Sequence, residues 1–182
     1  QVGDKINFSV PSGAFGNLFG GYLARSMGLP VNKFVCANNV NQTLHTIFSS
    51  GVLARKNLVQ TMSTAIDIVV PYNFWRFLYY CTGSDSEKLK VWQDEFKSSG
   101  KVEFDAATLN AIQNGFMSVT VSDYETSKTI KDTFETCDGY LLDPHTAVAV
   151  AAANTLRDML PKKMKVICLA TAHPAKFPET TR

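Results

Sequence analysis

Residues 5–17 read KINFSVPSGAFGN, and this stretch decides the fold. Its first half alternates apolar and polar residues up to Pro11, which is the pattern of a β-strand. Its second half is rich in glycine and small residues, which indicates a tight loop. Apolar residues at helical spacing follow over residues 18–27, and Gly28 then suits the position just after a helix. The stretch therefore predicts a strand, a glycine loop and a helix in direct succession.

The same alternation continues beyond this stretch. Residues 33–37 form a short apolar run that predicts a second strand, and Asn41 can cap a second helix that ends at Gly51. Strand, helix, strand, helix is typical of an α/β fold, in which helices pack on a parallel sheet through right-handed crossovers.

The rest of the chain is expected to be mostly helical up to one last strand. Residues 72–134 predict several helices, with a short strand at 117–121 among them. The dense aromatic residues of 72–80 are interpreted as core packing rather than as a surface that stacks nucleic-acid bases. Pro144 suits the first turn of an alanine-rich helix, and residues 165–170 predict a buried strand followed by a turn.

Composition and charge restrict the possible partners. The chain has 182 residues, of which 45% are hydrophobic and 19% charged, and this is an ordinary globular composition. The formal net charge of +2 provides no electrostatic basis for binding nucleic acid or an anionic membrane. No apolar run reaches the roughly 18 residues that a membrane helix needs. We therefore expect neither partner.

The cysteines and histidines suggest no metal site. The four cysteines stand far apart, at positions 36, 81, 137 and 168, and the three histidines lack metal-ligand spacing. We expect four buried thiols in a reducing compartment, namely the cytoplasm. The chain begins with Gln1 and shows no signal peptide, so we interpret it as a piece of a longer protein.

A glycine loop between a strand and a helix N-terminus can bind phosphate, because backbone amides approach the anion closely there. Residues 13–17 could supply such amides, with Ser12 offering a hydroxyl, although a plain tight turn has the same spacing. The Gly-Lys-Ser/Thr of a Walker loop is absent, and the glycines do not follow the G-x-G-x-x-G pattern. The second strand also lacks a following carboxylate for a ribose, so a nicotinamide-dependent dehydrogenase is the weaker enzyme hypothesis.

Several segments with a distinctive sequence are spread over nearly the whole chain. They are residues 10–17 (VPSGAFGN), 21–24 (GYLA), 27–30 (MGLP), 38–41 (NNVN), 63–68 (STAIDI), 71–73 (PYN), 143–149 (DPHTAVA) and 171–177 (TAHPAKF). Taken together and in this order, they resemble the threonine synthase and threonine synthase-like family.

The resemblance implies a pyridoxal 5'-phosphate enzyme of the tryptophan-synthase-β-like fold (fold type II), a three-layer architecture whose parallel sheet is flanked by helices. Threonine synthases convert O-phosphohomoserine and water into threonine and phosphate. The family's loop usually reads Ser-Gly-Asn-Phe-Gly-Asp, whereas this chain has Ala14 and Asn17. That variant looks more like the threonine synthase-like branch, which implies a phospho-lyase that eliminates phosphate from O-phosphohomoserine or O-phosphothreonine-type amino acids.

The resemblance also assigns site residues. It implies that the loop binds the cofactor phosphate and that Thr171 lies against the pyridine nitrogen. The loop residues are Ser12, Gly13, Ala14, Phe15, Gly16 and Asn17. The Schiff-base lysine of the family belongs to a segment before this chain begins, so no catalytic residue is assigned here and the chain alone is expected to be inactive. The missing amino-terminal half of the same protein is thus an implied partner.

The resemblance divides the chain into three parts of one catalytic domain. Residues 1–60 carry the phosphate-binding strand and helix units, residues 61–140 are mostly helical, and residues 141–182 hold a helix, the last strand and the turn on the pyridine side.

Three alternatives remain open from the residues. Lys176 could form a Schiff base, but nothing in the sequence shows the burial or the neighbours that would activate its amine. His145 and His173 could transfer protons or could hold a loop through hydrogen bonds, and we favour the second role. At the level of function, the chain could instead be a non-catalytic truncated form that acts by binding or signalling to a partner.

Overall fold

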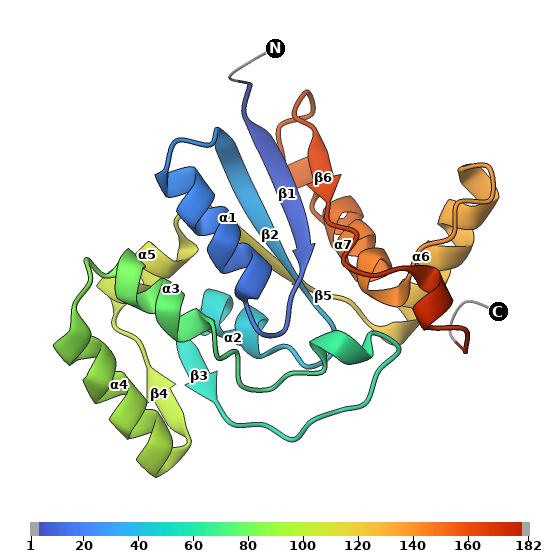
Figure 1. The fold of residues 1–182 in the computed structure, drawn as a ribbon. Coiled ribbons are helices and arrows are strands. Elements are labelled where there is room, and N and C mark those ends of the chain that lie inside the picture. Colours follow the sequence, from blue (N-terminus) through green and yellow to red (C-terminus); the bar gives the residue numbers. More distant parts are fainter. Residues whose placement is uncertain (1–3, 180–182) are drawn as a thin grey trace.

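A four-stranded parallel sheet forms the centre of the computed structural model, which describes residues 4–179 (Figure 1). Its strand order is β5-β2-β1-β6, and each neighbouring pair is parallel. The strands are β1 (Ile6–Pro11), β2 (Val31–Asn38), β5 (Phe116–Thr120) and β6 (Val166–Cys168). The predicted α/β fold with a parallel sheet is confirmed.

Helices cover both faces of this sheet, because alternate strand residues point to opposite sides. Phe34 and Phe116 join one apolar cluster with α1 (Gly16–Ser26), α2 (Thr43–Ser50) and α3 (Phe74–Cys81). Val35 and Ala37 point to the other face and pack against Val148 of α7 (Pro144–Thr155). The second helix of that side is α6 (Asp123–Thr136), which packs on α7. This arrangement gives the expected three layers.

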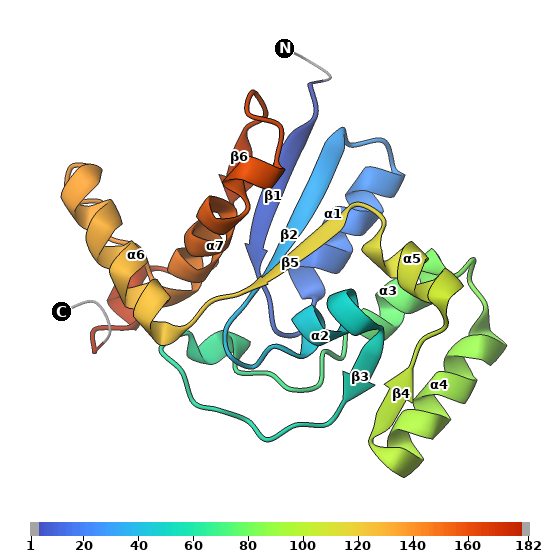
Figure 2. The same ribbon diagram turned by 180° about the vertical axis from the view of Figure 1, so that it is seen from behind.

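A helical excursion separates β2 from β5. It contains α4 (Ser86–Ser99), α5 (Ala106–Gln113) and a two-stranded antiparallel sheet of β3 (Val52–Ala54) and β4 (Lys101–Glu103), which was not predicted from the sequence. Three short 3-10 turns complete the described residues: η1 (Thr64–Ile66), η2 (Arg157–Met159) and η3 (Pro174–Lys176). Viewed from behind, α6 and α7 lie on the β6 side of the molecule, and α3 to α5 lie on the opposite side (Figure 2).

Most predicted helix ends are confirmed. The Gly28 amide donates to the Arg25 carbonyl just after α1, the Gly51 amide donates to the Ile47 carbonyl at the end of α2, and Pro144 begins α7. The prediction for Asn41 is wrong. Gln42 stands at the N-cap of α2, and Asn41 accepts a hydrogen bond from the Val59 amide instead.

Three further predictions concern burial. The strand expected to be buried at the carboxyl-terminal end of the chain is an edge strand, and Ile167 of β6 is 44% exposed. The prediction of four buried thiols is confirmed only for Cys36, since Cys81 and Cys168 are half-buried and Cys137 is exposed just after α6. Burial raises the pKa of Cys81 to about 12, although a backbone hydrogen bond partly opposes this shift. The aromatic run does pack in the core, since Phe74 and Phe77 are fully buried.

None of the helices in residues 4–179 combines the length and apolar character needed to cross a membrane.

Candidate functional site

Two loops predicted to bind a cofactor follow neighbouring strands of the sheet. The chain passes from β1 to β2 on one side and reaches β6 on the other side of β1, so the strand order reverses at β1. Ligands of open parallel sheets bind at such a point, outside the carboxyl ends of the strands. Ser9 pairs with Cys168 in the β1–β6 ladder. Three residues beyond that pair come Ser12 on one strand and Thr171 on the other.

The glycine loop turns sharply after β1. The Ser12 amide donates to the Ala37 carbonyl at 2.9 Å, which extends the pairing with β2, and the Ser12 Oγ accepts from the Phe15 amide at 3.1 Å. Phe15 has a φ of 68°, in the left-handed region, and is the N-cap residue of α1. A left-handed residue next to helical ones turns successive amides in one direction, which is the geometry of an anion-binding nest.

The start of α1 is open to an anion. No side chain caps this helix, and the amides of its first turn, at Gly16, Asn17 and Leu18, have no carbonyl partner within the helix. Gly16 and Asn17 are exposed. Amides and the helix dipole together favour a negative charge at this position. The predicted residues 12–17 therefore form one continuous loop that leads into a helix N-terminus, and its last two residues are exposed.

Not every predicted residue contributes a side chain to this loop surface. The Phe15 ring is fully buried and lies 5.2 Å from the rings of both Phe74 and Phe77, measured between centroids. Its backbone amide is already engaged by Ser12. Phe15 thus anchors the loop to the aromatic core. On the other strand, Thr171 is exposed and begins the turn that leads into η3.

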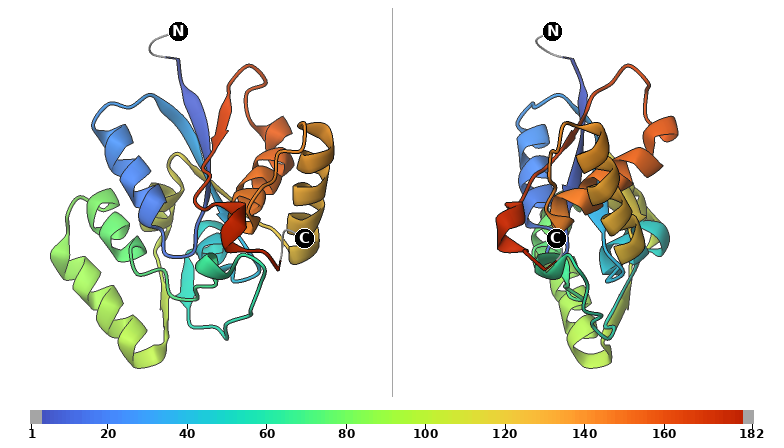
Figure 3. Two further views of the ribbon diagram at one scale, coloured as in Figure 1. Left: turned by 45° about the vertical axis from the view of Figure 1, so that its right-hand side comes forward. Right: turned by 90° about the vertical axis from the view of Figure 1, so that its right-hand side faces the viewer.

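Gly13 leaves no room between the loop and a neighbouring segment. A Cβ at this position would stand 2.8 Å from the Ile66 carbonyl oxygen and 2.9 Å from the Ile68 Cβ. The turn η1 therefore packs directly behind the glycine loop. Figure 3 shows that η1 also lies beside η3, below the carboxyl ends of the strands.

A polar network that was not predicted from the sequence holds the segment around η1. The Asp67 carboxylate accepts from the Asn39 Nδ2 at 2.7 Å, the Asn41 Nδ2 at 3.0 Å and the Thr61 amide at 3.0 Å. The Thr61 Oγ1 also donates to it at 2.7 Å. The only sequence signal was the cluster of asparagines after the second strand, since its distant carboxylate partner could not be identified from spacing.

His145 and Asp143 form a buried pair at the start of α7. The His145 Nδ1 lies 2.9 Å from the Asp143 Oδ1, and the Ala65 amide donates to the His145 Nε2 at 2.9 Å. Burial raises the pKa of Asp143, but hydrogen bonds from His145, Thr146 and their amides outweigh this effect and hold the pKa below its usual value. These contacts agree with the favoured interpretation of a histidine that holds a loop. His173 has a similar local role, because its Nδ1 accepts from the Ala175 amide at 3.2 Å.

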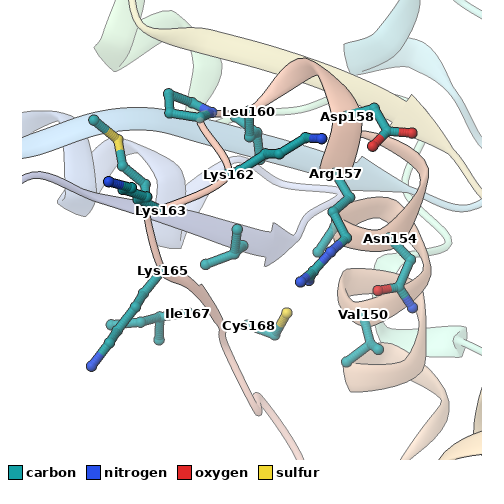
Figure 4. Close-up of a pocket in the computed structure, with 14 residues that line it drawn as sticks. Val150, Asn154, Arg157, Asp158, Leu160, Lys162, Lys163, Lys165, Ile167 and Cys168 are labelled. Carbon is teal, nitrogen blue, oxygen red and sulfur yellow. The ribbon is translucent and has the colours of Figure 1, made fainter.

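A separate cleft lies elsewhere in the described residues. It measures about 770 Å³ and lies along the outer edge of β6, between that strand, α7 and η2 (Figure 4). Its basic lining residues are Arg157, Lys162, Lys163 and Lys165. None of the predicted cofactor residues lines this cleft. Lys176 lies outside it and is exposed, so it lacks the burial that would activate a Schiff-base lysine.

The structure defines this chain as an α/β protein with a glycine loop at the point where the strand order of its parallel sheet reverses. The helix that follows this loop has no side-chain cap. Comparison with known proteins then identifies the family. The family model "Threonine synthase, C-terminal" matches residues 146–182. Threonine synthase from Pseudomonas aeruginosa is 41% identical over 96% of this chain, and human threonine synthase-like 1 is 33% identical over 97%.

Solved structures agree with this assignment. Threonine synthase from yeast superposes with a TM-score of 0.93 at 38% identity, covering 97% of this chain. A threonine synthase from Brucella melitensis with bound PLP gives a TM-score of 0.91 at 36% identity, covering 98%. The chain belongs to the threonine synthase and threonine synthase-like family, with its fold type II architecture. It spans 37% of the Pseudomonas protein and 24% of the human protein.

Proposed function

We propose that this chain is the cofactor-binding part of a PLP-dependent enzyme that eliminates phosphate from a phosphorylated amino acid. The observation that carries the proposal is the convergence of the glycine loop and the Thr171 turn at the ends of two adjacent strands. The PLP named for the Brucella relative, which is similar over nearly the whole chain, supports the same cofactor here.

The residues present fit the phosphate of PLP. The first turn of α1 offers amides with neither a side-chain cap nor an intrahelical partner, and Gly16 keeps that surface free of a side chain. The Ser12 hydroxyl uses its oxygen as an acceptor for Phe15, which leaves its proton available to a phosphate oxygen. We assign the phosphate to the loop of residues 12–17.

Thr171 fits the opposite end of the cofactor. Its hydroxyl would donate a hydrogen bond to the neutral pyridine nitrogen, whereas a carboxylate there would keep the nitrogen protonated. When bound, PLP supplies an electron sink for the negative charge that develops on the substrate during elimination. The role of this chain is then to hold both ends of the cofactor in fixed orientation.

The proposed substrates are O-phosphohomoserine and O-phosphothreonine-type amino acids. Asn17 carries no charge where the usual family pattern has a carboxylate, and Ala14 is smaller than the usual asparagine. An uncharged residue near the loop avoids repulsion of a phosphate group. Because threonine synthases also act on a phosphorylated amino acid, the proposal of a phospho-lyase rests on the likeness of this loop variant to the threonine synthase-like branch.

The remainder of the protein supplies the catalytic amine in this proposal. The chain covers 37% of the Pseudomonas relative, and the Schiff-base lysine is assigned to the part before it. That amino-terminal part is the proposed partner of this chain. We propose the cytoplasm as the compartment, because all four cysteines are free.

The full-length protein tests the proposal. After dialysis against PLP, it should bind the cofactor and release inorganic phosphate from O-phosphothreonine or O-phosphohomoserine, with no threonine formed from the latter. Formation of threonine in step with phosphate would contradict the lyase assignment. Absence of PLP binding would contradict the cofactor assignment and would favour a non-catalytic binding protein.

A further inference from the structure

His145 joins three segments that are distant in the sequence. Its ring is 1% exposed and stands at the start of α7, beside Asp143. On the other side of the ring, Nε2 accepts a hydrogen bond from the Ala65 amide of η1. The centroid of the His145 ring lies 4.8 Å from that of the Phe177 ring. Through Ala65 and Phe177, the histidine contacts two segments that lie next to the proposed cofactor site.

The partners of the ring determine its protonation state. A carboxylate only accepts hydrogen bonds, so Nδ1 carries the proton and donates to Asp143. The Ala65 amide only donates, so Nε2 is unprotonated. Both conditions are met only by the neutral imidazole with its proton on Nδ1. Asp143 in turn accepts from the His145 and Thr146 amides, which attaches the pair firmly to the first turn of α7.

The hydrogen bond from Ala65 to Nε2 connects His145 to the glycine loop through the short turn η1. Ala65 lies at the centre of η1, in which the Ile66 amide donates to the Ser63 carbonyl at 3.0 Å and the Asp67 amide to the Thr64 carbonyl at 3.1 Å. The next residue, Ile66, presents its backbone to the Cα of Gly13. A shift of Ala65 would therefore move the surface against which the glycine loop packs.

The contact with Phe177 connects His145 to the Thr171 end of the proposed site. Phe177 closes η3, since its amide donates to the Pro174 carbonyl at 2.9 Å. This turn belongs to the segment that starts at Thr171. His145 thus touches both segments that support the proposed cofactor site, one through Nε2 and one through its ring.

We propose that His145 is a positioning residue, which sets the phosphate-binding loop through its Nε2 acceptor and the turn η1. The inference rests on the proposed function, because it treats residues 12–17 as the phosphate site. It assigns no proton transfer to this histidine. The buried His145–Asp143 pair then affects phosphate binding selectively, in addition to stabilising the start of α7.

Two conservative variants separate the roles of the two ring nitrogens. In His145→Gln the amide oxygen can reach the position of Nε2 and accept from Ala65, whereas in His145→Asn the amide reaches only the position of Nδ1 and can donate to Asp143. In the full-length protein, the dissociation constants of PLP and of pyridoxal, which lacks the phosphate, are measured by equilibrium dialysis. Losing the acceptor of a buried amide predicts a roughly tenfold weaker PLP affinity for His145→Asn, with pyridoxal affinity nearly unchanged. His145→Gln should stay within about threefold of the wild type for both ligands.

The outcomes distinguish this inference from the proposed function. If the wild-type protein binds PLP no better than pyridoxal, the phosphate assignment itself fails. If it prefers PLP but His145→Asn keeps the full preference, or if His145→Gln loses it, the positioning role is wrong. Imidazole nitrogen NMR of the wild type adds a check that does not depend on a variant folding: it should show the Nδ1-protonated neutral tautomer, and the opposite tautomer or an imidazolium would overturn the inference.

Discussion

Replacing Gly13 with alanine gives the most direct test of how the glycine loop is built. The added Cβ would stand 2.8 Å from the Ile66 carbonyl oxygen, 2.9 Å from the Ile68 Cβ and 3.1 Å from the Ile66 Cα. These atoms belong to the backbone or are attached directly to it, so no side-chain rotation removes the clash. Either the loop or η1 must move.

Two opposing effects determine how much Gly13→Ala changes the free energy of unfolding. Inserting a methyl group into a packed site costs about 1–3 kcal/mol. Losing a glycine from the unfolded chain returns about 0.4–1 kcal/mol. We therefore expect Gly13→Ala to lower the free energy of unfolding by about 0.5–2 kcal/mol, as the difference of these terms. If the displacement falls on the loop, PLP affinity should drop by about tenfold, since each 1.4 kcal/mol changes affinity tenfold.

Two other glycines of the same region provide matched controls. A Cβ on Gly20, within α1, meets nothing within 4 Å, so Gly20→Ala should raise the free energy of unfolding by about 0.5–1 kcal/mol through helix propensity. A Cβ on Gly16 would approach only the Asn73 Nδ2, at 3.4 Å, so Gly16→Ala should lower the free energy of unfolding less than Gly13→Ala. Because Gly16 lies in the proposed phosphate site, this variant is a control for stability alone. Urea unfolding and equilibrium dialysis of the full-length protein measure both quantities. A Gly13→Ala protein with wild-type stability and affinity, beside a stabilised Gly20→Ala protein, would refute this account of the packing.

Three further predictions concern the same site. Thr171→Asp should change the absorption spectrum of bound PLP and lower turnover, because a carboxylate would keep the ring nitrogen protonated. An unchanged spectrum and rate would place the nitrogen's partner elsewhere. The pKa of Asp143 is lowered in the folded state, so its stabilisation is complete above the ordinary value of about 4 and is lost as the pH falls below it. Asp143→Asn should therefore flatten the fall of unfolding free energy between about pH 5 and pH 2, and equal slopes in the two proteins would contradict this. The isolated 182-residue chain, mixed with PLP and reduced with borohydride, should show only scattered, substoichiometric lysine labelling and no phosphate release from either substrate; one stoichiometric adduct with phosphate release would overturn the assignment of the catalytic lysine to another segment.

Local signals in the sequence were sufficient for most of the elements. The strand before the glycine loop, the helix after it and the start of α7 at Pro144 were predicted because alternation, helical spacing and capping chemistry act within a few residues. Asn41 shows where such reasoning fails. An asparagine before a helix is a good cap by propensity, but here its side chain bonds to Val59 and Asp67, which no local rule could anticipate.

The candidate site also has parts that the sequence predicted and parts that only the structure showed. The sequence by itself determined the glycine loop and the Thr171 turn, because each is a continuous segment whose character depends on its own residues. Only the tertiary structure brought the two together, through the strand order that puts β6 beside β1. It also decided that η1 packs behind Gly13 and that His145 links η1 to Phe177. These contacts join segments that are far apart in the sequence, and such pairings arise from how whole layers pack rather than from the spacing of residues along the chain.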